Sequence, residues 1–286
     1  MDDIAATDTG PPPGREPRPR RALAATLAVA VVLIAAGTYA AADSLLGRVS
    51  TTDETIERPV RSLHLMLVHG DARISGYDGD TIRIRRTLTR SVLEPVERRE
   101  FRGDALKITT VCHYTAGDCR VDYDIKVPRR TMIDASLAFG HADFRGLSGD
   151  VDLTVLIGSA ALSGLDGPVT VKTLHQELEA TDISGPVFKA DSSGGDIFLK
   201  QVDSPKVDVH SNGGDITMRG TGENESVSAI TDNGDITVLL PEKAEAHDVH
   251  ASAPTEPVIE IPQAQDGPPI FARSETGTVI IRQEER

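Results

Sequence analysis

Residues 195–199 read Gly-Asp-Ile-Phe-Leu, and the pattern returns as Gly-Asp-Ile-Thr-Met at residues 214–218 and as Gly-Asp-Ile-Thr-Val at residues 234–238. The copies follow one another at a nearly constant spacing. A fixed period of about 20 residues is typical of proteins in which similar units stack on one another. The repeat therefore predicts a stack of units rather than a single irregular core.

A related pattern extends the repeat toward the N-terminus at a slightly shorter, constant spacing. It reads Leu-Ser-Gly-Asp-Val, Leu-Asp-Gly-Pro-Val and Ile-Ser-Gly-Pro-Val at residues 147–151, 165–169 and 183–187. Each unit holds two short stretches in which apolar and polar residues alternate, separated by Gly, Asp, Ser, Asn or Pro. At least five units therefore run from about residue 140 to residue 240.

Alternation over so few residues is typical of strands with one buried face. After residue 43, Gly, Pro or Asp interrupts the chain every few residues, and no window holds a long apolar stripe at helical spacing. We therefore expect an all-β fold, a β-solenoid of stacked short-strand coils of about 18–20 residues, with coils about 4.8 Å apart. An antiparallel β-sandwich is the alternative.

The N-terminal part of this region carries a degenerate copy of the repeat. Residues 70–80 align without a gap against residues 140–150, which matches glycines with glycines and apolar positions with apolar positions. Residues 61–86 are therefore expected in the same β layer. Residues 93–102 are charged and irregular, which indicates a loop or a short helical turn.

An uncharged segment precedes the predicted solenoid. Residues 22–42 hold no charged side chain, and at about 1.5 Å per residue a helix of this length reaches about 30 Å, enough to cross a membrane. Four arginines lie between residues 15 and 21, and Asp43 follows the segment. The positive-inside rule then predicts a single-pass protein of the cell membrane, with a cytoplasmic N-terminus and an extracytoplasmic C-terminal domain. A cleaved signal peptide ending at residues 40–42 is the alternative.

The expected organisation has six parts. They are a cytoplasmic Pro/Arg-rich tail (1–21), a transmembrane helix (22–42), a linker (43–60), an N-terminal β part with a Cys112–Cys119 hairpin (61–130), the β-repeat region (131–250), and a Pro-rich loop with a terminal strand (251–286). The loop at residues 251–269 contains five prolines, and the charged final strand at residues 276–282 is expected to protect the end of the stack.

Cys112 and Cys119 are the only cysteines of the chain. A hairpin with a loop over residues 114–117 would place them opposite each other. Export permits a disulfide, which we favour over two free thiols, and closing so short a loop stabilises the fold by about 2 to 3 kcal/mol. Six residues separate the two cysteines, whereas a catalytic dithiol has two, and one pair is too small a ligand set for zinc.

The charge distribution excludes some classes of partner. The net charge is −14, and residues 131–286 hold 26 acidic and 10 basic residues, so the repeat half alone carries −16. The chain has no Trp, and only 3% of its residues are aromatic. Nucleic-acid binding needs a basic face and stacking aromatics, so we expect no nucleic-acid partner.

The repeat would stack Asp196, Asp215 and Asp235 in a row. A Ca²⁺ row is one interpretation, since stacked carboxylates repel and a hard cation would relieve the repulsion. The favoured interpretation is turn chemistry, in which each carboxylate accepts backbone N–H groups, so no metal or cofactor is expected. His247 and His250 are three residues apart, which on a strand places them on opposite faces. No motif of a metalloprotease, a serine hydrolase or a phosphate-binding loop is present, so no catalytic residue is expected.

The apolar strands, then Val-Pro-Arg at residues 127–129, then the Gly-Asp-Ile units resemble the bacterial putative-adhesin family of β-strand-repeat proteins, a domain of unknown function. The resemblance covers residues 60–282 and implies a β-solenoid, often on a membrane-anchored chain, with no catalytic residues. We expect a non-enzymatic, membrane-anchored, extracytoplasmic protein that binds an unidentified cell-envelope or surface ligand. The alternatives are an envelope-stress or signalling accessory and an enzyme acting on polysaccharides.

Overall fold

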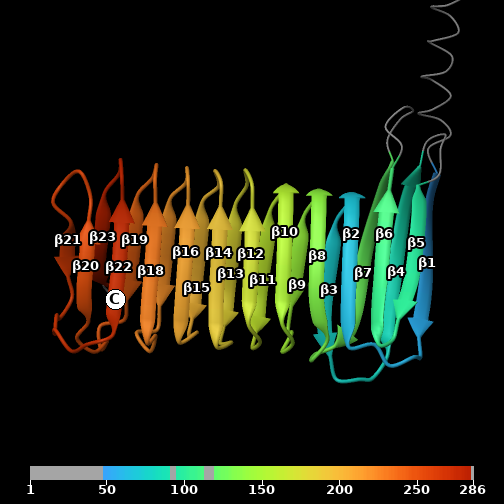
Figure 1. Cartoon of the computed structure of the whole chain (residues 1–286), viewed down its shortest axis with the longest axis horizontal. Helices are drawn as coiled ribbons and strands as arrows, with labels where there is room; N and C mark the ends of the chain where they lie inside the picture. Colours follow the sequence, from blue (N-terminus) through green and yellow to red (C-terminus); the bar gives the residue numbers. More distant parts are fainter. Residues whose placement is uncertain (1–47, 91–94, 113–118, 285–286) are drawn as a thin grey trace, which may run out of the picture. The chain divides into compact units, whose positions relative to one another are not determined.

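The computed structural model describes residues 48–90, 95–112 and 119–284 (Figure 1). Gly47–Arg286 form one compact unit. The predicted tail and transmembrane segment, residues 1–42, lie outside the described residues. In the described part the chain forms 23 strands and no helix, so it offers no helix long and apolar enough to span a bilayer.

The strands form two sheets. In spatial order, sheet A contains β1 (Arg48–Ile56), β4 (Ile82–Arg90), β7 (Arg120–Pro128), β3 (Ala72–Tyr77), β9 (Ala142–Arg145), β11 (Ala160–Leu165), β13 (Leu178–Ile183), β15 (Ile197–Val202), β17 (Ile216–Gly220), β19 (Ile236–Leu240), β23 (Val279–Gln283) and β21 (Val258–Glu260). Sheet B contains β20 (Asp248–Ser252), β22 (Pro269–Ser274), β18 (Ser226–Thr231), β16 (Lys206–Ser211), β14 (Val187–Ser192), β12 (Val169–Thr173), β10 (Val151–Ile157), β8 (Met132–Phe139), β2 (Ser62–His69), β6 (Ala105–Val111) and β5 (Val96–Arg102).

Each repeat contributes one strand to each sheet. In sheet A, the three isoleucines of the Gly-Asp-Ile units, Ile197, Ile216 and Ile236, are register partners on the parallel strands β15, β17 and β19. The prediction of a β-solenoid of stacked short-strand coils is confirmed for the repeat region. An antiparallel sandwich is wrong there, because neighbouring strands run parallel.

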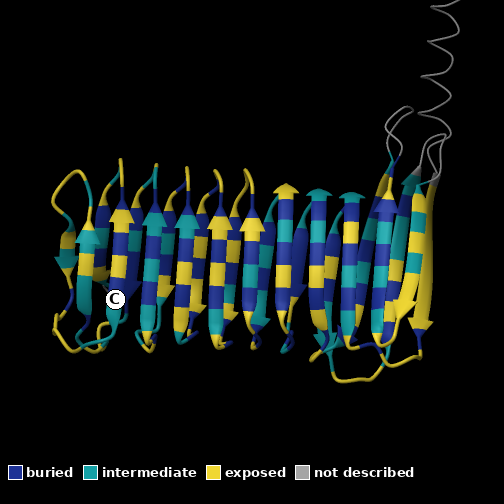
Figure 2. Cartoon of the chain, viewed as in Figure 1, coloured by how far each residue is buried: buried dark blue, intermediate teal, exposed yellow. Residues whose placement is uncertain are grey.

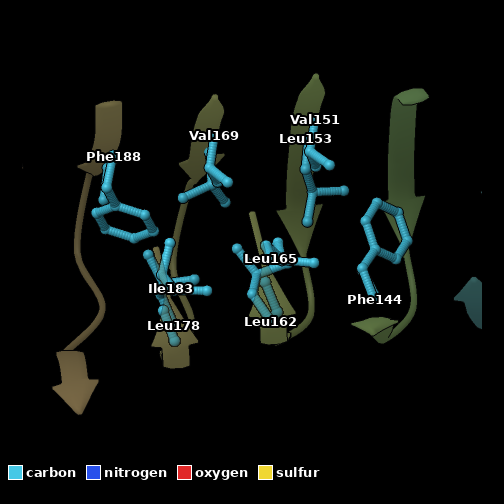
Figure 3. Packing of buried hydrophobic residues seen from close by; sticks show 14 of the residues in the cluster. Phe144, Val151, Leu153, Leu162, Leu165, Val169, Leu178, Ile183 and Phe188 are labelled. Atoms are coloured by element: carbon cyan, nitrogen blue, oxygen red, sulfur yellow. The ribbon is translucent and has the colours of Figure 1, made fainter. Parts of the chain in front are cut away.

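The core is a thin aliphatic layer between the sheets. Alternate residues are buried in the strands between the end strands β1, β5, β20 and β21 (Figure 2). The inward side chains of one coil stack on the same positions of the next. Figure 3 shows Phe144 and Phe188 on either side of a group of Leu, Ile and Val residues from both sheets. Both phenylalanines are fully buried. Most other positions hold aliphatic side chains, which fit the narrow space between coils.

The recurring glycine has a steric cause. Gly214 stacks on the backbone of Gly195 one coil away, where an added Cβ would lie 2.5 Å from the carbonyl carbon of Gly195. Gly234 meets Gly214, and Gly277 meets Gly234, in the same way. A side chain at these positions would force neighbouring coils apart, so the repeat retains Gly.

The stacking order differs from the chain order at the N-terminal end. The coil of β2 and β3 lies directly beside the coil of β8 and β9, with Ala72 paired to Ala142 and Ile74 to Phe144 (Figure 1). The ungapped alignment between these two parts of the sequence is therefore confirmed. The intervening β6 and β7 extend the stack on the other side of β2 and β3, and β1, β4 and β5 complete it as antiparallel strands.

Three expectations for this end are wrong. Residues 43–60 are not only a linker, because β1 pairs with β4 along its whole length. Residues 93–102 include β5 rather than a loop or a helical turn, because the charged side chains of this edge strand find ion-pair partners. The cysteines do not flank a hairpin, because β6 belongs to sheet B and β7 to sheet A. The predicted hairpin loop, residues 114–117, lies outside the described residues.

At the C-terminal end, too, the stacking order differs from the chain order. β20 and β21 are the outermost strands, so the final strand β23 lies inside the stack and does not protect its end. The proline-rich segment predicted as a loop contains β21, and β20 runs into its first residues. The chain therefore places the outermost coil first and then turns back to fill the position beneath it.

Candidate functional site

The predicted row of aspartates serves the backbone. Oδ1 of Asp196 accepts the N–H of Asp215 at 2.9 Å, and Oδ1 of Asp215 accepts the N–H of Asp235 at 2.8 Å. Oδ1 of Asp235 accepts the N–H of Thr278 at 2.7 Å and its hydroxyl at 2.9 Å. The backbone N–H of Thr278 lowers the pKa of Asp235. Each carboxylate thus links its coil to the next, as the turn interpretation requires.

The same column continues at the N-terminal end, where the sequence patterns did not indicate it. Oδ1 of Asp122 accepts the N–H of Asp71 at 2.8 Å, and Oδ1 of Asp71 accepts the N–H of His141 at 2.9 Å. Asp71 directly precedes β3, as Asp196 precedes β15. Within the described ranges, no three His, Cys, Asp or Glu residues are grouped so that they could hold a metal ion.

The two cysteines form a disulfide between the sheets. Cys112 follows β6 in sheet B, Cys119 precedes β7 in sheet A, and their Cα atoms lie 5.8 Å apart. The bond therefore closes the connection between the two strands of one coil, near the N-terminal end of the stack.

Charged residues cover that end between the sheets. Glu97 of β5 accepts hydrogen bonds from Arg86 of β4 and Arg99 of β5, and Arg99 also reaches Glu54 of β1. Burial alone would raise the pKa of Glu97, but the hydrogen bond from Arg86 and the charge of Arg99 outweigh it and lower the pKa. Beneath this cluster, burial raises the pKa of Tyr123. The cluster shields the last coil from water and is a structural cap.

His247 and His250 lie in different environments, as the sequence predicted. His247 is buried, and its Nδ1 lies 3.2 Å from the carbonyl oxygen of Pro268. His250 lies on the outer face of sheet B, where its Nε2 is 3.1 Å from Oδ2 of Asp248. They do not converge on one site.

The outer face of sheet B carries a groove near its C-terminal edge. The groove has a volume of about 670 Å³ and is lined by Ser228, Ile230, Val249, His250, Ala251, Ser252, Phe271, Ala272 and Arg273. Phe271 is 47% exposed, and the ring of His250 stacks on it with centroids 4.9 Å apart. Sequence reasoning missed this site, because its residues come from β18, β20 and β22 and the inverted stacking order brings them together.

The chemistry of the groove suits binding. The face of the Phe271 ring that His250 does not cover offers an apolar surface, Ser228 and Ser252 supply hydroxyl groups, and Arg273 adds a cation that is paired with Glu275 at 2.8 Å. Aromatic faces bordered by hydrogen-bonding groups recognise rings that are apolar on one face and polar at the edge.

Several solved structures resemble this chain at low sequence identity. A crystal structure of a putative adhesin from Bacteroides fragilis is 14% identical, covers 83% of this chain and 97% of its own, and gives a TM-score of 0.49. A putative lipid binding protein from Parabacteroides distasonis is 15% identical with the same coverage and a TM-score of 0.46. A putative adhesin from Parabacteroides distasonis is 13% identical, covers 83% of this chain and 98% of its own, and gives a TM-score of 0.34. No curated protein matches the sequence.

The family itself is identified by sequence. Residues 112–254, half of the chain, match the family described as Toastrack DUF4097. This match confirms the expected resemblance to a β-repeat family of unknown function. The chain belongs to the Toastrack DUF4097 family.

Proposed function

We propose that this protein is a membrane-anchored protein of the cell envelope that binds a surface ligand through the groove on sheet B, as an adhesin-like module. Residues 22–42 would anchor the chain, with residues 1–21 in the cytoplasm and the solenoid outside it. The uncharged segment and the arginines before it support this orientation. The Cys112–Cys119 disulfide also supports an extracytoplasmic solenoid, because disulfides persist in oxidising compartments.

The groove carries the proposal for binding. Phe271 has an outward-facing ring of which nearly half is exposed, although aromatic residues make up only 3% of the chain. A large apolar side chain held at the surface is explained by contact with a partner. The stacked ring of His250 packs against one face of the Phe271 ring, and Ser228 and Ser252 line the same groove.

We assign a glycan of the envelope or of a neighbouring cell surface as the ligand. A sugar ring has an apolar face that packs on an aromatic ring and hydroxyl groups at its edge that pair with serines and with Arg273. The flat, open face of a parallel sheet can accept a polymer along its length. The net charge of −16 over residues 131–286 favours neutral or cationic glycans over polyanions.

Binding is tested with the full chain in detergent against insoluble cell-wall polysaccharide in a co-sedimentation assay. Phe271→Ala should lower the bound fraction at least tenfold. Phe198→Ala is the matched control, because Phe198 is 38% exposed on the outer face of sheet A, away from the groove. Equal binding by both variants would refute the groove as the site.

Location is tested separately by fusing alkaline phosphatase to the C-terminus after Arg286. The fused enzyme folds and acts only outside the cytoplasm, so activity in whole cells is the expected result. Replacing the arginines at residues 15–21 by Glu should reduce that activity. A full-length fusion that is inactive in whole cells would contradict the proposed orientation.

A further inference from the structure

Three side chains on the outer face of sheet B form a hydrogen-bonded series far along the stack from the groove. Oγ of Ser62 lies 2.9 Å from Nε2 of His64, and Nδ1 of His64 lies 2.9 Å from Oδ2 of Asp134. Ser62 and His64 are two residues apart on β2 and therefore share a face. Asp134 is the register partner of His64 on the adjacent β8. We call this set the Ser62 triad.

The protons of the triad follow from its partners. An ionised carboxylate only accepts hydrogen bonds, so Nδ1 of His64 donates its proton to Asp134. In a neutral imidazole the other nitrogen, Nε2, is then an acceptor, and the hydroxyl of Ser62 donates to it. This arrangement gives the serine a base within reach and gives the base an orienting carboxylate, which is the geometry of an activated nucleophile.

Space for a substrate lies beside the triad. A hollow of about 300 Å³ opens on this face, and His64 and Asp134 are among its lining residues. Ala105, the register partner of Ser62 on β6, also lines the hollow, so Ser62 occupies the strand position next to a lining residue. Lys107 also lines the hollow as the register neighbour of His64, and its own register partner Glu100 on β5 lines it as well.

Other polar pairs of the solenoid lack one member of this set. His141 lies 2.6 Å from the hydroxyl of Ser159 through Nδ1, but the carboxylate of Asp71 bonds the backbone N–H of His141 rather than its ring. His250 has a carboxylate partner in Asp248. Of the three histidines compared, His64, His141 and His250, only His64 joins a hydroxyl and a carboxylate through hydrogen bonds of its ring.

We propose that the Ser62 triad is a hydrolytic site for small carboxylic esters, such as acyl groups carried on the hydroxyls of a polymer. Oγ of Ser62 would attack the ester carbonyl carbon while its proton passes to Nε2 of His64. The carbon–oxygen bond to the alcohol breaks, and the alcohol leaves with that proton. Water then attacks the acyl-serine with His64 as base, which releases the carboxylic acid and restores the hydroxyl of Ser62.

The open position of the site limits the substrate class. The side chain of His64 is 40% exposed and that of Asp134 is 60% exposed, so the site excludes little water. A small ester that projects from a large polymer can reach such a face, whereas a peptide bond needs a deeper cleft and stronger stabilisation of the oxyanion. Asp134 would be a positioning residue, since it touches only His64.

The test uses the full chain in detergent with p-nitrophenyl acetate and with a biotinylated fluorophosphonate that labels activated serines. We expect labelling at Ser62, located by mass spectrometry, and a rate of ester cleavage at least tenfold lower in Ser62→Ala and His64→Gln. Asp134→Asn should also lower the rate, because its amide can donate to Nδ1 and so favours the wrong tautomer. Ser159→Ala is the matched control and should retain both labelling and rate.

Each outcome bears on the proposal. Retained cleavage or labelling in Ser62→Ala, with circular dichroism like that of the unchanged chain, would show that the triad is only a cross-strand polar contact and would overturn it. If Ser62→Ala is poorly folded, the pair His64→Gln and Asp134→Asn decides the question in the same assays. Glycan co-sedimentation and ester cleavage are measured in separate assays, so failure of glycan binding and failure of hydrolysis are separate results.

Discussion

The glycine column makes a prediction that two adjacent residues can test. In Gly214→Ala, the new Cβ would lie 2.5 Å from the carbonyl carbon of Gly195 and 2.9 Å from the backbone nitrogen of Asp196. In Gly213→Ala, the nearest atom would be the Cα of Gly194 at 3.7 Å, an ordinary contact. The same methyl group is therefore added at neighbouring positions, once in a backbone clash and once at ordinary contact distance.

The expected magnitude follows from what must move. Backbone cannot rotate away from the methyl group, so the coils separate, and such overpacking costs about 1 to 3 kcal/mol. Two hydrogen bonds across this contact are then weakened, from Ser211 Oγ to the carbonyl of Gly195 at 3.4 Å and from the N–H of Asp215 to Asp196 at 2.9 Å. At about 1 kcal/mol for each, the total loss is about 3 to 5 kcal/mol. In a domain of this size that lowers Tm by about 10 °C.

Thermal and urea unfolding of the full chain in detergent, followed by far-ultraviolet circular dichroism, measures both variants. Gly213→Ala should change the stability by less than about 1 kcal/mol, and in the stabilising direction, because alanine restricts the unfolded chain. Equal melting temperatures for the two variants would refute the reasoning that coil-to-coil contact at Gly214 retains the glycine.

Three further predictions concern the cap, the aspartate row and the disulfide. Glu97→Gln should destabilise the fold by about 1 to 3 kcal/mol at neutral pH, whereas Glu100→Gln, at an exposed position, should not. Folding lowers the pKa of Glu97, so its contribution to the stability of the fold is present above its unfolded pKa and is lost as the pH falls through its folded pKa. Asp235→Ala should cost about 1 kcal/mol in urea unfolding, and neither Ca²⁺ nor a chelator should shift the Tm of the unchanged chain. The double variant Cys112→Ser and Cys119→Ser should lose about 2 to 3 kcal/mol, and a reducing agent should then have no further effect.

The repeat region could be predicted in detail because its sequence period is its structural period. Aligning the copies of the repeat matches Ile197 with Ile216 and Ile216 with Ile236, and the structure pairs them in the same way. Apolar alternation identified the buried face, and the Gly and Asp positions identified the turns. Nothing beyond local pattern and spacing was needed where each coil lies beside its neighbours in the chain.

The ends could not be predicted in this way because alternation shows which face of a strand is buried but not which strand lies beside it. β5 has Glu97 and Arg99 on its shielded face, so its pattern lacks the apolar residues by which a strand is recognised. β6 and β7 follow one another in the sequence, which favours a hairpin, yet each pairs within a different sheet. The groove around Phe271 likewise forms because the stacking order differs from the chain order at the C-terminal end.

The Ser62 triad was predictable in part, more than the ends of the stack and less than the repeat region. The ungapped alignment that matches Gly70 with Gly140, continued toward the N-terminus, places His64 opposite Asp134, and the structure has this register. The pairing of base and carboxylate was therefore contained in the repeat, and Ser62, on the same strand as His64 and next but one to it, necessarily shares its face. What the pattern lacked was a reason to examine outward-facing positions, because the repeat was recognised through its buried residues and its turns. In a solenoid the register that builds the core also lines up the side chains outside it, so an alignment of coils predicts surface clusters as directly as it predicts packing.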